Sequence, residues 1–259
     1  MGLIVNADDF GKNEDVNKAI AKCFENGITD RTTIMINMPC AKEACEISKE
    51  QGFMDRVGLH INLTEGSPLT DGIKEEALIC DEDGSFNALF MQSLKHRLYM
   101  PLSCREHIKE EIRAQIDRYH EMGFSLDHLD SHHHVHTNAP ILKVLRQLSK
   151  EYDFRSIRIS RNLYQETHLF NDIYKYIYNA SVRRICRESS RYFGSFNDVC
   201  EYFSYPIEEE SMDKIVGFCQ RRDLEIMVHP MYLRDGTLMD SDIPMKREKA
   251  LYEACRENQ

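Results

Sequence analysis

The stretch LIVNADDFGKNEDVNKAIAKCFENGITDRTTIMIN (Leu3–Asn37) reads as one strand, one helix and a second strand in succession. Leu3–Val5 is a short apolar run typical of a buried strand, and Asn13–Phe24 then carries its apolar residues at helical spacing. An Asn-Gly pair at 26–27 ends that helix, and Thr32–Asn37 is a second strand-like run. The segment therefore predicts a strand–helix–strand unit of an α/β fold.

The same alternation continues to the end of the chain. It predicts helices at 41–49, 104–122, 139–151, 163–187, 207–221 and 246–256, and strands at 57–63, 124–129, 157–159, 201–205 and 224–228. The segment from 64 to 104 interrupts the pattern, because it contains more Gly, Pro and Asp-Gly turn signals than a regular element tolerates. We predict about seven strand–helix units and one long inserted loop or lid.

This order predicts a parallel sheet covered by helices. The sheet could close into a barrel, or nearly so, or it could stay open and doubly wound, and periodicity does not separate these two forms. The chain contains no Pro/Gly/Ser-rich linker, low-complexity tract or internal repeat. We therefore predict a single domain over residues 1–259.

Composition argues against several classes of partner. Apolar residues make up 42% and charged residues 29%, which is typical of a globular protein without a membrane span. The 43 acidic residues outnumber the 33 basic ones, and the net charge of −10 disfavours binding to nucleic acid. The first residues lack the features of a signal peptide, so we expect a cytoplasmic location. The nine cysteines form no CxxC pair, and we expect most to be reduced and buried.

Polar side chains recur where predicted strands end, which is where parallel α/β folds place their active sites. Four such groups are present: Asn6 with Asp8 and Asp9; His60 with Asn62; the run HLDSHHHVH (His128–His136); and His229. We expect these groups to meet around one pocket, although they are separated by more than 200 residues of sequence.

The run His128–His136 is the strongest local signal, because it holds five of the eleven histidines. Neutral imidazole is a common metal ligand, and crowded imidazoles repel one another when protonated, so the run indicates metal binding. A solvated histidine-rich loop is the alternative. Asp130 or His128 could fix the tautomer of a ligating histidine.

The other three groups are weaker when taken singly. One carboxylate of Asp8-Asp9 can bind a cation while the other accepts a proton, but such a pair also forms turns that cap helices. His60 lies on the polar face of an alternating strand, where a structural core histidine is the alternative. His229 precedes a proline and could be a general acid or base, or could simply make a hydrogen bond within a turn.

Four motifs together resemble the YdjC-like carbohydrate deacetylase family, which includes chito-oligosaccharide and diacetylchitobiose deacetylases. They are LIVNADDFG (Leu3–Gly11), GLHINLTEG (Gly58–Gly66), HLDSHHHVH (His128–His136) and IMVHP (Ile226–Pro230). They span nearly the whole chain, while 165–191 matches little. The resemblance implies a TIM-barrel-like fold, seven-stranded or irregular here, that removes the N-acetyl group from a sugar with a divalent metal, usually magnesium.

Carried onto this chain, the resemblance implies Asp9, His60 and His132 as metal ligands, Asp8 as general base and His229 as general acid. Arg158 matches a family arginine in type and could orient Asp8 or the acetyl group. The residues that follow it, SRN at 160–162, depart from the proline and acidic residue expected there. Candidates for groups around the metal or substrate are Asp130, His128, His134, Arg158 and Asn62.

The cofactor prediction is a divalent metal. The resemblance puts Mg²⁺ first, while two histidines and a carboxylate suit Zn²⁺, the close second choice. The predicted partner is a small N-acetylated carbohydrate, and a homodimer is left open. The alternatives are a metal-dependent phosphoesterase, which usually needs several metals and an early His-x-His pair absent here, and a non-catalytic metal- or sugar-binding protein.

Overall fold

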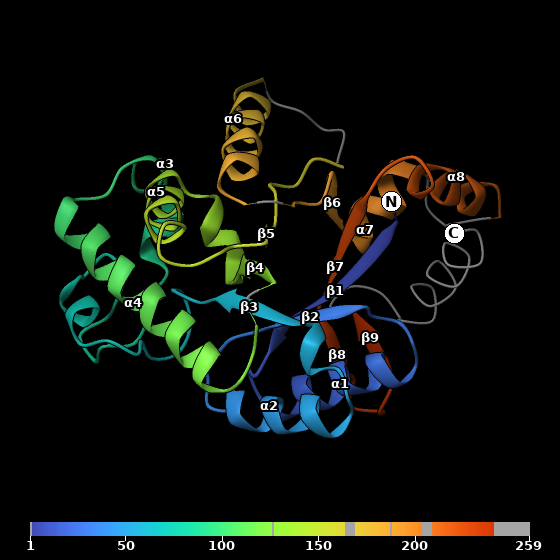
Figure 1. Cartoon of the computed structure of the whole chain (residues 1–259), viewed down its shortest axis with the longest axis horizontal. Coiled ribbons are helices and arrows are strands. Elements are labelled where there is room, and N and C mark those ends of the chain that lie inside the picture. The colour runs from blue at the N-terminus through green and yellow to red at the C-terminus, as the bar shows by residue number, and fades with distance from the viewer. Residues whose placement is uncertain (1, 126, 164–168, 187, 204–208, 241–259) are drawn as a thin grey trace.

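Strand β1 (Leu3–Phe10) lies inside a seven-stranded parallel sheet in the computed structural model (Figure 1). It pairs with β2 (Arg31–Ile34) on one side and with β7 (Leu224–Val228) on the other. The strand order is β5-β4-β3-β2-β1-β7-β6. The structure describes residues 2–125, 127–163, 169–186, 188–203 and 209–240.

The sheet is curled towards a barrel. The remaining strands are β3 (Val57–Ile61), β4 (His128–Ser131), β5 (Ser156–Ile157) and β6 (Tyr192–Ser195), and every neighbouring pair is parallel. The segment that follows β5 reaches the other edge strand, β6: the backbone N–H groups of Asn162 and Leu163 donate to the carbonyl of Phe193 at 3.1 and 3.3 Å. The prediction of a TIM-barrel-like α/β fold is confirmed, and the barrel is irregular.

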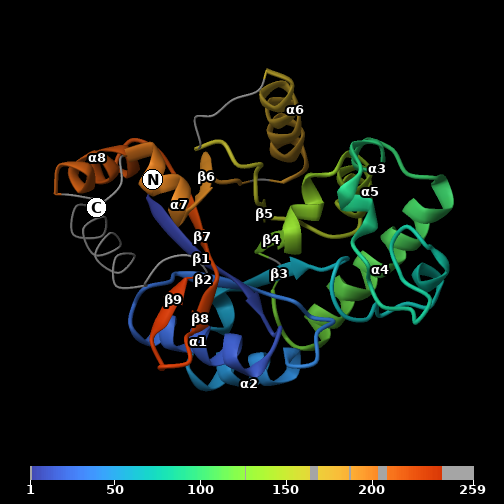
Figure 2. The same cartoon turned by 180° about the vertical axis from the view of Figure 1, so that it is seen from behind.

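Helices surround the sheet. They are α1 (Glu14–Glu25), α2 (Ala41–Glu50), α4 (Leu102–Glu121), α5 (Ala139–Leu148), α6 (Leu169–Ile185), α7 (Phe196–Phe203) and α8 (Glu209–Cys219). Figures 1 and 2 show α1 and α2 beneath the sheet, α4 and α5 at one end, and α7 and α8 at the other. Apolar side chains from strands and helices form the core between them. Among the described residues, no helix is long and apolar enough to cross a membrane.

The insertion between β3 and α4 is packed rather than open. It contains the short helices η2 (Gly72–Glu75), η3 (Leu89–Gln92) and α3 (Leu94–Leu98). Phe86 and Phe90 are buried. Glu111 of α4, also buried, accepts hydrogen bonds from the backbone N–H groups of Leu69 and Thr70 at 2.8–3.0 Å. The insertion is therefore fixed to α4.

The prediction of a sixth strand at 201–205 is wrong. Residues 201–203 belong to α7, and the sixth strand is β6, while 204 and 205 lie outside the described residues. Ser195 and Asp198 explain where α7 begins. The N–H of Ser195 donates to Oδ2 of Asp198 at 2.5 Å, and the N–H of Asp198 donates to Oγ of Ser195 at 3.3 Å. This reciprocal cap starts a helix directly after a four-residue strand.

Other boundaries differ less. The strand predicted at 124–129 is β4 and begins only at His128. The helices predicted at 163–187 and 207–221 are α6 and α8, and the helix predicted at 246–256 lies outside the described residues. An antiparallel hairpin of β8 (Pro230–Tyr232) and β9 (Leu238–Asp240), which we did not predict, packs beside α1. The single domain over 1–259 stays a prediction.

Candidate metal centre and active site

Asp8 and Asp9 are adjacent in β1, yet both side chains reach polar partners in, or directly after, other strands of the curled sheet. Adjacent side chains of a regular strand face opposite sides. Here Asp9 has a left-handed backbone with φ of 72°, and the register between β1 and β2 shifts between Ala7 and Phe10. This irregularity lets both carboxylates lie in the same site.

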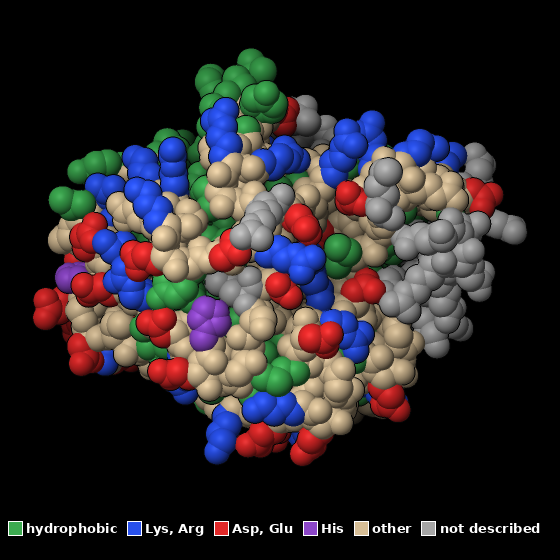
Figure 3. All heavy atoms as spheres, in the orientation of Figure 1, with side chains coloured by type: hydrophobic (Ala, Val, Ile, Leu, Met, Phe, Trp, Pro, Cys, Tyr) green, Lys and Arg blue, Asp and Glu red, His purple; other side chains and the backbone are tan. Residues whose placement is uncertain are grey.

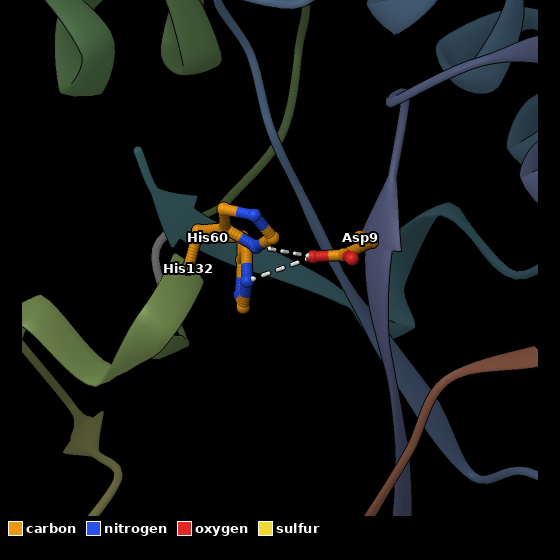
Figure 4. Close-up of side chains that lie close together, drawn as sticks. All are labelled: Asp9, His60 and His132. Atoms are coloured by element: carbon orange, nitrogen blue, oxygen red, sulfur yellow. Dashed lines mark hydrogen bonds and ion pairs between the residues drawn. The ribbon is translucent and has the colours of Figure 1, made fainter. Parts of the chain in front are cut away.

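Asp9, His60 and His132 converge at the carboxyl end of the sheet (Figure 4). Oδ1 of Asp9 lies 3.2 Å from Nε2 of His60 in β3 and 2.8 Å from Nδ1 of His132, which begins the 3-10 helix η4 (His132–Thr137) after β4. All three residues are buried. Burial raises the pKa of Asp9, but hydrogen bonds from both histidines outweigh it and hold that pKa well below its usual value.

This triad fits a divalent cation. One ligand atom from each residue lies within 4.8 Å of the other two. A first-row divalent ion binds imidazole nitrogen and carboxylate oxygen at about 2.0–2.2 Å, so two such bonds easily span separations of 2.8 and 3.2 Å. The three side chains would need to move apart only slightly to bind a common ion.

Asp130 orients His60. Nδ1 of His60 lies 2.6 Å from Oδ1 of Asp130, and the Thr33 hydroxyl donates to the other carboxylate oxygen at 3.0 Å. Burial lowers the pKa of His60, but the charge of Asp130 and its hydrogen bond raise that pKa to about 10. Because Asp130 accepts the Nδ1 proton, Nε2 is directed at Asp9, which is the arrangement that metal-ligating histidines use.

Asp8 is held by Arg158. The two terminal guanidinium nitrogens of Arg158 donate to the two carboxylate oxygens of Asp8 at 2.7 and 2.8 Å, and the Asn6 amide donates at 2.7 Å. Burial raises the pKa of Asp8, but the Arg158 charge and hydrogen bonds outweigh it, so that pKa lies below its usual value. Asp8 is therefore an ionised carboxylate at neutral pH.

Arg158 joins three carboxylates at the centre of the site. Besides Asp8, its Nη2 lies 2.7 Å from Oδ2 of Asp130, and its Nε donates to Oε1 of Glu225 at 2.8 Å. Arg158 is completely buried, and the other oxygen of Glu225 lies 3.1 Å from Arg31. The fork of Arg158 thus fixes Asp8 relative to the residue that orients His60.

Two further clusters of potential ligands lie deeper within the described part of the chain: Asp8 with His60 and Asp130, and His128 with Asp130 and Glu225. In each of them Arg158 is already paired with the carboxylates. A cation there would lie beside a buried guanidinium and would be repelled. The triad that contains Asp9 is therefore the best candidate metal site.

The rest of the histidine run has other contacts. His133 lies 3.0 Å from the Thr64 hydroxyl, at the edge of the site. His134 is half-buried, and desolvation, together with the charge of Arg158, lowers its pKa to about 3. Both residues have left-handed backbones, with φ of 51° and 55°. His134 is therefore a neutral imidazole near Arg158 and outside the triad.

His128 and His136 contact residues outside the triad. His136 bonds to the Ser131 hydroxyl, which also accepts the N–H of His136 at 2.9 Å. His128 begins β4, so it lies at the amino end of the sheet, 3.1 Å from the Ser156 hydroxyl and 3.4 Å from Glu225. One ring nitrogen of His128 lies within 4.8 Å of both Glu225 and Asp130, which joins it to the base of the Arg158 network.

His229 follows β7 and is half-buried. Its backbone N–H donates to Asp240 of β9 at 2.9 Å, so the hairpin fixes its backbone. A charge on His229 lowers the pKa of Asp8, more weakly than Arg158 and His60 do. Because Val228 pairs with Ala7, His229 follows β7 at the same end of the sheet at which Asp8 follows Ala7.

Asn62 holds the loop after β3. Its amide donates to the Glu65 carbonyl at 2.6 Å, and its Oδ1 accepts the N–H groups of Thr64 and Glu65 at 3.1 Å. The loop carries Glu65 to His132, where Oε2 lies 3.0 Å from Nε2, and Lys12 pairs with the same oxygen at 2.8 Å. Asn62 therefore lies behind the site and orders one wall of it.

Three of these residues were not predicted from the sequence: Glu225, Glu65 and Lys12. Glu225 did carry a signal, because it is a single charge in the apolar strand LEIMV, and a buried charge needs a partner. Glu65 and Lys12 lie inside motifs already quoted, but nothing local marks them, since their roles depend on the position of His132.

A separate cavity of about 880 Å³ opens at the opposite end of the barrel. Its lining includes Leu3, Val57, His128 and Leu224, the residues with which four strands begin. Parallel α/β enzymes bind substrate at the carboxyl ends of their strands, so this cavity is not the candidate substrate site.

Proteins of three named organisms are similar in sequence to this chain. A protein of Thermoanaerobacter pseudethanolicus is 30% identical over 251 residues, which cover 95% of this chain and 87% of the relative. A protein of Clostridium beijerinckii is 31% identical, with 97% and 90% covered, and one of Vibrio cholerae is 36% identical, with 59% and 56% covered. All three are named carbohydrate deacetylase.

A solved structure shares the fold. It is a putative cellobiose-phosphate cleavage protein of Enterococcus faecalis, with a TM-score of 0.67 and 22% identity over 99% of this chain and 94% of that chain. The model of the family described as YdjC-like protein matches residues 2–257. Since that match includes every residue of the triad, of the Asp8–Arg158 pair and of the strands between them, the chain belongs to the YdjC-like protein family.

Proposed function

We propose that the protein is a metal-dependent hydrolase that removes the N-acetyl group from a small N-acetylated sugar or chito-oligosaccharide. The observation that carries this proposal is the convergence of Asp9, His60 and His132 beside an ionised Asp8. Its support is the likeness, over nearly the full chain, to relatives named carbohydrate deacetylase.

In this proposal Asp9, His60 and His132 would hold a divalent cation, whose chemistry when bound would be to lower the pKa of water and to polarise the acetyl carbonyl. Asp8 accepts a proton from the water whose oxygen forms the new bond to the carbonyl carbon. Arg158 holds both oxygens of Asp8, which fixes the direction of that transfer. Its charge also makes Asp8 a weak base, so the water must itself be activated.

His229 is the proposed general acid. The bond between the carbonyl carbon and nitrogen breaks as a proton passes from the imidazolium of His229 to the departing amine. Acetate and the free amino sugar are the products. Water supplies the oxygen that acetate gains and, through the two proton transfers, the hydrogen that the amine gains. Such a proton transfer typically contributes 10²–10⁴-fold to rate.

We place Mg²⁺ first as the native ion on family resemblance and Zn²⁺ close behind on ligand type. Two imidazoles and one carboxylate suit zinc and its neighbours in the first transition row, whereas Mg²⁺ prefers oxygen ligands. Elemental analysis of the protein purified without added metal distinguishes the two. A cytoplasmic location and a homodimer also stay predictions.

Acetate release tests the activity directly. Purified protein is incubated with N-acetylglucosamine, diacetylchitobiose and triacetylchitotriose, before and after chelation and metal return. We expect release from at least one sugar, its loss on chelation, and a loss of at least about 10²-fold in Asp8→Asn. Asp71→Asn, in an exposed residue that pairs with Lys74, is the matched control and should keep full activity.

The same assay addresses the two alternatives. Full acetate release by Asp8→Asn would remove Asp8 from the mechanism. If phosphate esters are hydrolysed and no N-acetyl sugar is, the protein is a phosphoesterase. Sugar binding without release of acetate or phosphate would identify a non-catalytic binding protein.

A further inference from the structure

Both histidines of the triad lie between two carboxylates, but they face Asp9 with different ring nitrogens. In His60, Nε2 lies 3.2 Å from Asp9 and Nδ1 lies 2.6 Å from Asp130. In His132 the order is reversed: Nδ1 lies 2.8 Å from Asp9, and Nε2 lies 3.0 Å from Oε2 of Glu65. In Figure 4 one ring nitrogen of His132 is bonded to Asp9 and the other is not. The second nitrogen of His132 is the one that Glu65 contacts.

The loop that carries Glu65 is fixed to α4. Gln115, which is completely buried, donates to the carbonyl of Asn62 at 2.8 Å and accepts the N–H of Asn62 at 3.1 Å. Asn62 in turn accepts the N–H of Glu65 at 3.1 Å and donates to its carbonyl at 2.6 Å. Because the backbone of Glu65 is held at both groups, little further conformational entropy is lost when its side chain contacts His132.

Lys12 holds the carboxylate of Glu65 in place. Its Nζ lies 2.8 Å from Oε2 of Glu65 and 3.7 Å from Oδ2 of Asp9, so it separates two carboxylates that would otherwise repel each other. Exposed ion pairs alone contribute little to stability. Figure 3 shows Lys, Arg, Asp and Glu side chains intermixed over the face that it draws. The pair of Lys12 and Glu65 differs from an ordinary surface pair, because its carboxylate also contacts the buried ring of His132.

We infer that Glu65 is a positioning residue of the metal centre: it accepts the Nε2–H of His132 and so leaves Nδ1 as the nitrogen that binds a cation. Neutral imidazole carries its proton on one nitrogen and a lone pair on the other, so a partner that accepts at Nε2 selects Nδ1 as the ligand. Histidines that bind metals usually donate their second N–H to a carboxylate or carbonyl. The inference rests on the proposed function only in assuming that the triad holds a cation.

Glu65 is placed to orient a ligand rather than to bind the ion itself. The two nitrogens of an imidazole lie on different edges of the ring, so Glu65 and Asp9 contact different edges of His132. The residues whose ligand atoms lie within 4.8 Å of one another here are Asp9, His60 and His132, without Glu65. A cation bound by Glu65 would also lie beside the ammonium of Lys12 and would be repelled.

The positions of the ring protons test the inference directly. The full chain is labelled with nitrogen-15 histidine and loaded with Zn²⁺, and long-range proton–nitrogen NMR spectra identify the protonated nitrogen of each zinc-bound ring. We expect opposite patterns in the two rings, with Nε2–H in His132 and Nδ1–H in His60. Two zinc-bound rings that both carry the proton on Nδ1 would overturn the inference, as would a protein that binds no zinc.

Zinc affinity provides a second measurement, by competition with a chelating dye. Glu65→Ala removes the acceptor and should weaken zinc binding about 10–100-fold. Glu65→Gln keeps an acceptor oxygen without the charge and should restore most of the affinity. The matched control is Glu106→Ala in α4, because Glu106 pairs with Lys109 at 2.6 Å and the two side chains are 44% and 21% exposed, against 39% and 25% for Glu65 and Lys12. It should leave the affinity unchanged, and equal affinities of Glu65→Ala and the wild type would overturn the inference.

Neither measurement uses acetate release, so the role of Glu65 and the proposed function can fail separately. Zinc bound through Nδ1 of His132, in a protein that releases acetate from no N-acetyl sugar, would uphold the role of Glu65 and reject the deacetylase. Acetate release by a protein whose His132 binds zinc through Nε2 would uphold the deacetylase and reject the role of Glu65.

Discussion

Arg158 is completely buried and lies within 2.7–2.8 Å of oxygens from Asp8, Asp130 and Glu225. Its planar fork matches the two oxygens of Asp8, which a lysine ammonium cannot do. One guanidinium therefore sets the position of the candidate base and stabilises two further buried carboxylates. Its loss should affect both activity and stability.

We expect Arg158→Lys to reduce acetate release by at least about 10²-fold and to lower the free energy of unfolding by about 3 kcal/mol, because buried carboxylates lose hydrogen bonds. Urea titration and initial rates measure the two effects. Arg113→Lys is the matched control, because Arg113 forms a two-oxygen pair with Glu151 at the exposed surface. Arg113→Lys should lower the free energy of unfolding by less than about 1 kcal/mol. Equal effects of the two changes would contradict the role given to Arg158.

Asp130→Asn tests the orientation of His60. The neutral amide oxygen accepts a weaker hydrogen bond from Nδ1 than the carboxylate does. The His60 ring is then held less firmly with Nε2 towards Asp9. We expect metal affinity to fall about 10–100-fold, measured by competition with a chelating dye. Asp127→Asn, in a half-exposed residue whose nearest partner is Arg155 at 3.6 Å, should leave the affinity unchanged.

The raised pKa of His60 gives a pH dependence whose sign is fixed. A group whose pKa rises from 6.5 in the unfolded chain to about 10 on folding stabilises the protein fully below pH 6.5. That contribution is lost as pH rises from about 6.5 to 10. The metal-free protein should therefore unfold more easily across this window, as measured by thermal melts at constant ionic strength.

Metal binding should show the opposite trend, because His60 must lose a proton before Nε2 can bind an ion. We expect the apparent dissociation constant to fall by up to about tenfold per pH unit between about pH 7 and 9. An affinity that is independent of pH over that range would show that His60 is not a ligand.

At the scale of single elements, β1 shows what the sequence could and could not predict. Its apolar start and the acidic pair after it were enough to predict a strand and a site at its end. The left-handed Asp9 and the register shift with β2 were not predictable, because they depend on the pairing of β1 with its neighbour. That irregularity is what brings Asp8 and Asp9 into one site.

Gly11 follows this irregularity and tests it. Its φ is +88°, and a Cβ there would lie 3.0 Å from Cα of Ala41. Gly27 also has a positive φ, of +67°, but nothing lies within 4 Å of its Cβ position. Gly11→Ala should therefore destabilise the protein by about 2–3 kcal/mol and Gly27→Ala by about 1 kcal/mol. If the two changes lowered the free energy of unfolding equally, the close approach of α2 would not constrain the turn at Gly11.

Short elements account for the wrong prediction of the sixth strand. β6 has only four residues, and the helix after it starts from a Ser195–Asp198 cap that could have been recognised in the sequence. The insertion, with its short helices, is held by hydrogen bonds from Leu69 and Thr70 to Glu111, which lies 42 and 41 residues further along the chain. Local patterns do not contain such contacts.

At the scale of the whole molecule, the curl of the sheet decides which polar residues meet. Alternation of strands and helices predicted the class of fold but did not distinguish a barrel from an open sheet. Because the sheet curls, His60 from β3 and His132 after β4 reach Asp9 of β1. The same curl places Arg158 opposite Asp8, 150 residues earlier in the chain.

The most direct test is a crystal structure of the protein loaded with Mn²⁺ or Zn²⁺, with the ion located by anomalous scattering. We predict one strong peak within about 2.0–2.3 Å of Asp9 Oδ1, His60 Nε2 and a ring nitrogen of His132. A peak held instead by His134 and His136, or by His128 and Glu225, would contradict the account, as would the absence of any ordered ion at the triad.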